Sequence, residues 1–261
     1  MKLTQPSPRF LQICLNLSLF LVTLIVNTLA TALPLGGRTT AEISDSFNSL
    51  FVPAGYVFSI WGLIYLALIG FTVFQALPGE QVNPSVRATG YLAALSGVFN
   101  SLWIVLWHTG YYPLTLAVML ALLGTLIVLY RRLAALQPAN AATRWLVHAP
   151  FSLYLGWISV ATIANASAVL LDLGWDGMPL GSVAWTVVMV AAATALALLM
   201  AFRHRDLVYV SVIAWALAGI LVKQAAIFPI AAAVVTGLVA ILAGVVAARW
   251  RGPGQALEAA P

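Results

Sequence analysis

Aromatic and asparagine side chains recur at helical spacing in three apolar segments, and these residues are the chain's candidates for chemistry. Residues three or four apart lie on one face of a helix, so each set would present its side chains together. Such faces could line a cavity for an apolar ligand. They could equally pack helices together, because small and polar residues are common between membrane helices. The sets are Phe58, Trp61 and Tyr65; Asn100, Trp103 and Trp107; and Tyr154, Trp157, Ala161 and Asn165.

The sequence lacks the usual motifs of catalytic and metal sites. Every Asp, Glu, Lys and Arg falls in a loop or at the end of an apolar stretch. His108, His148 and His204 also lie near such ends, without the spacing of metal ligands. A phosphate-binding Walker A loop, a Gly-x-Ser-x-Gly elbow and paired carboxylates are absent as well. We therefore expect no enzyme and no metal site, and we assign any chemistry to a bound ligand.

Composition places the chain in a membrane. Of 261 residues, 62% are apolar and only 7% are charged, whereas soluble domains carry about 25% charged residues. This excludes a soluble globular protein, a disordered chain and a coiled coil. The net charge of +5 comes without any basic block longer than two arginines, so it favours membrane orientation over nucleic-acid binding. The single cysteine, Cys14, permits no internal disulfide bond.

Eight apolar stretches are long enough, or nearly so, to cross a membrane as helices, which takes about 20 residues. The first is longer than the h-region of about 7–15 residues in a signal peptide, so we expect it to be retained. The turn His108–Tyr111 makes the third and fourth helices antiparallel neighbours. We predict an all-α membrane protein with the spans Phe10–Leu33, Gly55–Leu77, Thr89–Trp107, Tyr112–Tyr130, Leu146–Leu171, Val183–Phe202, Leu207–Val222 and Ala225–Ala248.

Lys and Arg residues are distributed unequally across these spans. With eight spans, Arg38 and Lys223 fall on one side, together with the long loop Pro34–Ala54. Because Lys and Arg gather on the cytoplasmic side, we predict a multi-pass inner-membrane protein with both termini in the cytoplasm. The residues assigned to the cytoplasmic side are Lys2, Arg9, Arg87, Arg131, Arg132, Arg144, Arg203, Arg205, Arg249 and Arg251.

Three motifs on the second, third and fifth spans resemble the TspO/MBR family, the tryptophan-rich sensory proteins related to the mitochondrial translocator protein. Pro53 followed by Trp61-x-x-x-Tyr65 matches the first, and Asn100-x-x-Trp103 matches the second. The third reads Trp157-x-Ser-x-Ala-Thr-x-x-Asn165. The resemblance covers roughly residues 10–172.

Three positions depart from the family pattern. Phe58 lies one position nearer Trp61, Leu153 replaces a proline, and Val105 replaces another. These differences leave the expected fold intact and bear on the shape of the pocket.

The resemblance implies a five-helix core at 1–172, and residues 173–261 would add a three-helix extension. It implies a binding or sensor protein for flat hydrophobic ligands, such as the tetrapyrroles porphyrin and haem or sterol-like molecules, with no covalent cofactor. A transporter or exporter of such compounds, or a structural membrane subunit, remains the alternative. The expected ligand-binding residues are Phe58, Trp61, Tyr65, Asn100, Trp103, Tyr154, Trp157, Ala161 and Asn165.

The expected partners are the lipid bilayer and a hydrophobic small molecule, with no nucleic acid. The eighth span carries small residues four apart, including Gly237 and Gly244. Such a seam permits close helix approach, either within the chain or to a second copy in a homodimer.

Overall fold

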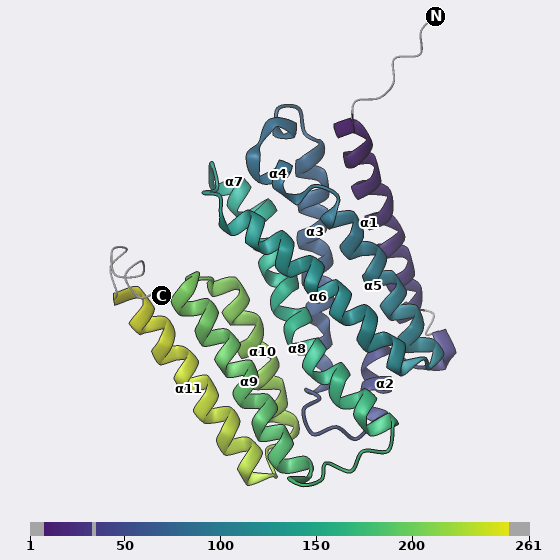
Figure 1. Ribbon diagram of the computed structural model, residues 1–261, viewed down its shortest axis with the longest axis vertical. Coiled ribbons are helices and arrows are strands. Elements are labelled where there is room, and N and C mark those ends of the chain that lie inside the picture. The colour runs from purple at the N-terminus through teal and green to yellow at the C-terminus, as the bar shows by residue number, and fades with distance from the viewer. Residues whose placement is uncertain (1–7, 33–34, 251–261) are drawn as a thin grey trace, which may run out of the picture. The chain divides into compact units, whose positions relative to one another are not determined.

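The computed structural model describes residues 8–32 and 35–250. Within those residues every regular element is a helix, which confirms the all-α prediction (Figure 1). Among the described residues, seven helical segments are long and apolar enough to span a membrane, and the shorter apolar helix α10 (Leu207–Lys223) corresponds to the predicted span Leu207–Val222. Leu33, Lys2 and Arg251, which enter the predicted spans and orientation, lie outside the described residues.

Short elements join the long helices and cap their ends. The long helices are α1 (Pro8–Ala32), α3 (Ile60–Ala76), α5 (Leu92–Thr109), α6 (Tyr112–Ala134), α8 (Ala149–Asp172), α9 (Gly181–Arg203), α10 and α11 (Phe228–Trp250). The short ones are η1 (Leu35–Gly37), α2 (Thr40–Ser46), η2 (Gly55–Ser59), η3 (Glu80–Val82), α4 (Pro84–Thr89), α7 (Ala141–Thr143) and the π-helical turn η4 (Arg144–His148).

The turn between α5 and α6 has the chemistry that ends one helix and begins another. Gly110 takes a left-handed backbone with φ of 83° after the last turn of α5. Pro113 then lies in the first turn of α6, where its missing N–H breaks no helical hydrogen bond. The two helices pack against each other, as the short predicted turn requires.

The chain forms two compact units. Unit 1 comprises Met1–Ile43 and Ser59–Ile158, and unit 2 comprises Ser44–Phe58 and Ser159–Pro261. Helix α8 therefore contributes residues 149–158 to the first and residues 159–172 to the second. In unit 1, α5 packs against both α1 and α6, and α1 contacts α3. The predicted division into 1–172 and 173–261 concerns domain organisation and stays a prediction.

Unit 2 is built around the C-terminal helices, which run side by side in Figure 1. A Cβ atom on Gly237 of α11 would lie 2.5 Å from Thr194 Oγ1, and one on Gly244 would lie 2.4 Å from Leu198 Cδ2. Both glycines therefore allow α11 to approach α9 closely. The small-residue seam serves packing within the chain.

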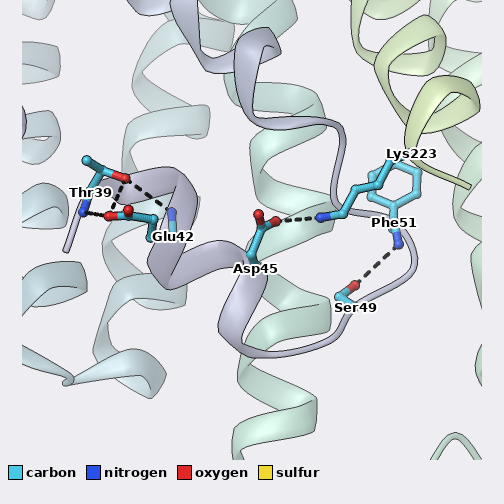
Figure 2. Close-up of polar contacts among 6 residues, drawn as sticks. All are labelled: Thr39, Glu42, Asp45, Ser49, Phe51 and Lys223. Atoms are coloured by element: carbon cyan, nitrogen blue, oxygen red, sulfur yellow. Dashed lines mark hydrogen bonds and ion pairs between the residues drawn. The ribbon is translucent and has the colours of Figure 1, made fainter.

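Asp45 and Lys223 form an ion pair within unit 2 (Figure 2). Asp45 follows the first predicted span, whereas Lys223 follows the seventh. Six predicted spans separate them, so an eight-span topology places both on the same side of the membrane. The ion pair agrees with that arrangement.

Candidate functional site

Four predicted site residues contact the indole ring of Trp61, and we call the five together the aromatic cluster. Trp61 stacks on Tyr65, one turn along α3, with centroids 5.5 Å apart and an angle of 18°. The ring of Trp103 on α5 lies 6.4 Å away at 30°. Tyr154 and Trp157 of α8 make edge contacts at 6.1 and 6.2 Å. These arrangements are the favourable ones for aromatic pairs.

A file of rings continues from the aromatic cluster along α5. Trp103 stacks on Trp107 at 5.6 Å, and Trp107 meets the edge of Tyr112 at 5.5 Å. The indole N–H of Trp107 donates to the carbonyl oxygen of Thr40 at 3.4 Å. Thr40 Oγ1 is also hydrogen-bonded to His108 Nε2 at 3.1 Å. The file thus runs from the start of α2 to Tyr65.

Asn100 is the polar centre beside these rings and is fully buried. Its Oδ1 accepts a hydrogen bond from Asn27 Nδ2 of α1 at 2.7 Å. The Asn100 side chain also lies close to the hydroxyl groups of Tyr65 and Tyr154. Four helices, α1, α3, α5 and α8, therefore bring polar atoms to one place.

Three buried polar atoms of this centre lack a hydrogen-bond partner within the described part of the chain. They are Tyr65 Oη, Asn100 Nδ2 and Trp103 Nε1. An unpaired buried polar group costs about 1–3 kcal/mol, and most such groups in native structures bind protein or water. All three atoms can donate a hydrogen bond. The arrangement therefore suits a bound group that accepts hydrogen bonds.

The other three predicted residues belong to unit 2. Phe58, at the end of η2, and Ala161 are half-buried, and Asn165 is buried. Whether they line one ligand site with the aromatic cluster stays a prediction. All nine residues lie on the elements that the spacing predicted, except that Phe58 precedes α3 in a separate 3₁₀ turn.

The rings of the aromatic cluster contact one another, so the side chains themselves occupy the space between them. A small cavity of about 20 Å³ lies among α1, α3, α5 and α8. Its polar lining is Asn16, Thr23, Thr72 and Ser96, and Tyr154 also borders it. This volume suits one water molecule. A ligand at the aromatic cluster would therefore have to separate the rings.

Sequence reasoning missed the polar face of α1. Asn16 Nδ2 donates to Gln75 Oε1 at 3.0 Å, and Asn16 Oδ1 accepts from the Ala94 N–H at 3.0 Å. Thr23 Oγ1 donates to the Gly97 carbonyl at 3.1 Å. Asn16, Thr23 and Asn27 are seven and four residues apart, which puts them on one face. This spacing in the sequence could have revealed the polar face. The face includes Asn27, which is hydrogen-bonded to Asn100.

A capping box begins α2, next to the end of the ring file. The backbone N–H of Thr39 donates to Glu42 Oε2 at 2.6 Å, and the Glu42 N–H donates to Thr39 Oγ1 at 3.3 Å (Figure 2). The backbone and hydroxyl donors of Thr39 and the charge of Arg38 lower the pKa of Glu42 below its ordinary value. Such reciprocal bonds satisfy the free donors at a helix start. They fix where the chain enters α2.

Comparison with known proteins gives one finding. The model of a family described as TSPO-like protein matches residues 12–248. The matched region extends past residue 172, where the motif resemblance was expected to end, and includes α9, α10 and nearly all of α11. Searches among curated proteins and solved structures found no match.

Proposed function

Because the chain belongs to the TSPO-like protein family, we propose that it is a multi-pass membrane receptor that binds a flat hydrophobic ligand at the aromatic cluster. The proposed ligand is a tetrapyrrole such as protoporphyrin, with sterol-like molecules as the second class. The proposed role is binding or sensing rather than catalysis. No group of three His, Cys, Asp or Glu side chains in the described residues could hold a metal ion, and the proposal requires none.

The observation that carries the proposal is the set of unpaired donors beside stacked rings. Tyr65 Oη, Asn100 Nδ2 and Trp103 Nε1 are buried and unbonded within residues 8–32 and 35–250. Packing alone would favour apolar atoms at these positions, because hydrocarbon offers no water to replace a missing partner. A planar ligand with acceptor oxygens at one edge would stack on the rings and accept from the donors. A tetrapyrrole carboxylate provides such oxygens, whereas a sterol offers one hydroxyl.

The test is a binding titration followed by intrinsic tryptophan fluorescence, which nine Trp residues make sensitive. Purified protein in detergent is titrated with protoporphyrin IX and, separately, with cholesterol. Saturable quenching by protoporphyrin IX at one equivalent is the expected result. The same titration of N-acetyltryptophanamide in detergent corrects for light absorption and random collision. Quenching that stays linear and matches this control for both compounds would leave the rings as packing between helices.

We further propose that the chain lies in the inner membrane with its even-numbered loops in the cytoplasm. Reporter fusions after Arg132 and Arg205 should give a cytoplasmic signal, and fusions near Asp45 and Asp176 should give an external one. The unequal Lys and Arg distribution is the reason. A cytoplasmic signal at Asp45 would reverse the orientation and place the segment before α3 inside the cell.

A further inference from the structure

We propose that α10 positions residues 44–58, which lead into α3, and that this contact sets ligand affinity at the aromatic cluster. The inference concerns a helix outside the predicted five-helix core. The expected effect of α10 on ligand affinity rests on the proposed function. The expected effect of α10 on the position of residues 44–58 does not. We call residues 44–58 the strap. The strap and α10 both belong to unit 2.

One face of α10 makes all of the contacts that support the proposal. Trp215, Gly219 and Lys223 are spaced four residues apart, so they lie on one side of the helix. Trp215 and Gly219 both meet the strap near Val57, and Lys223 meets it at Asp45. The contacts comprise a side-chain hydrogen bond, a backbone hydrogen bond at a close approach and an ion pair.

At Gly219 the backbone of α10 approaches the strap closely. The backbone N–H of Ala54 donates to the Gly219 carbonyl at 3.1 Å. A Cβ atom at position 219 would lie 2.2 Å from Val57 Cγ2 and 3.1 Å from Pro53 Cβ. Val57 is fully buried, so it has little room to move away. Any side chain at position 219 would therefore force Val57, or the strap backbone that carries it, to shift.

Trp215 holds the end of the strap. Its indole N–H donates to the Val57 carbonyl at 3.2 Å, and its ring meets the ring of Tyr56 edge-on at 5.5 Å. Phe51 and Val52 are also buried. The strap is therefore packed at Phe51, Val52 and Val57, whereas Tyr56 is about half exposed.

The third contact is the ion pair of Lys223 with Asp45, which Figure 2 shows at the other end of the strap. Both side chains are partly exposed, at 29% and 47%. Exposed pairs contribute little to stability and weaken in salt. This contact therefore tunes the position of the strap, whereas Gly219 determines whether the strap can sit on α10 at all.

Chain connectivity carries the effect from the strap to the ligand site. The strap ends at Phe58, a predicted site residue, and α3 begins at Ile60. Trp61, the central ring of the aromatic cluster, is the next residue. Because a helix is a stiff element, a shift of its first residues would re-aim the ring of Trp61. Trp215, Gly219 and Lys223 are positioning residues in this scheme, since they act through the strap.

The deciding variant is Gly219→Ala, with Gly124→Ala as its matched control. Gly124 is also a helical glycine, but a Cβ there meets nothing within 4 Å. We expect Gly219→Ala to weaken protoporphyrin IX binding about tenfold, or about 1.4 kcal/mol, because the displaced strap would re-aim Trp61, and we expect Gly124→Ala to leave binding unchanged. Hydrogen exchange at the amides of residues 54–63 should rise in Gly219→Ala only. Unchanged affinity in a folded Gly219→Ala protein would overturn the proposal.

Two other outcomes of the experiment also have a defined interpretation. If the unaltered protein shows no saturable binding, the proposed function fails, and hydrogen exchange alone decides whether α10 positions the strap and the first turn of α3. If Gly219→Ala does not fold, Lys223→Glu and the exchanged pair Lys223→Glu with Asp45→Lys replace it. Lys223→Glu should weaken binding at low salt, and the exchanged pair should restore it. Equal affinity in both would contradict the proposal.

Discussion

Replacing Trp61 by Leu is expected to weaken protoporphyrin IX binding about tenfold, or about 1.4 kcal/mol, while the protein stays folded. Trp61 contacts the rings of Tyr65, Trp103, Tyr154 and Trp157, so it is the surface that a planar ligand would share. Leu keeps the position apolar but removes the ring. Aromatic stacking contributes about 0.5–1.5 kcal/mol per pair beyond buried area. Fluorescence titration of the purified variant measures the change.

Trp145→Leu is the matched control, because Trp145 is 63% exposed. It removes one indole, and with it part of the fluorescence, without touching the aromatic cluster.

Trp157→Leu and Ala161→Phe extend the test across α8. If the predicted site includes position 161, Ala161→Phe should block binding by adding a ring where the ligand would lie. If position 161 is instead tightly packed, the larger ring would overpack it at roughly 1–3 kcal/mol and lower the melting temperature. Unchanged affinity in folded Trp61→Leu, Trp157→Leu and Ala161→Phe proteins would refute the ligand site.

The sequence predicted the helices well because length and apolar content alone decide whether a segment can span a membrane. The residues that share one face of a helix could be predicted equally well, because they follow from the helical spacing. Trp61 and Tyr65 stack as their spacing indicates, and so do Trp103 and Trp107. Contacts between helices were harder to predict. That Trp61 lies over Trp103 depends on how α3 and α5 pack, which no periodicity within either helix determines.

The contact of the strap with α10 lay beyond the reach of sequence patterns for a related reason. Trp215 and Val57 are 158 residues apart, and neither is one of the motif residues. Gly219 is one of 19 glycines, and only the positions of Pro53 and Val57 reveal why this one lacks a side chain. The polar face of α1 differs, because Asn16, Thr23 and Asn27 were visible as polar residues at helical spacing within an apolar run.

Removing either member of the buried Asn27–Asn100 pair should lower the free energy of unfolding by about 1–3 kcal/mol. Asn27 Nδ2 donates to Asn100 Oδ1 at 2.7 Å, and both side chains are at least 94% buried, with 6% and 0% exposed. Asn27→Leu would leave Asn100 Oδ1 without this donor, beside the already unpaired Nδ2. Leu has as many side-chain heavy atoms as Asn and leaves no cavity, so the loss reports the missing hydrogen bond together with any crowding by the larger methyl groups. Unfolding in detergent, followed by far-UV circular dichroism, measures it.

The double variant Asn27→Leu with Asn100→Leu isolates the interaction energy between the two side chains. Because both polar partners are then gone, the double variant should lose less than the sum of the single variants. The difference should be about 0.6–1.7 kcal/mol, the range found for polar pairs between membrane helices. Thr28→Leu, at an exposed position of α1, should change little. Strictly additive losses would mean that α1 does not hold Asn100 in place. The orientation of the Asn100 side chain would then have to come from its contacts with the other helices.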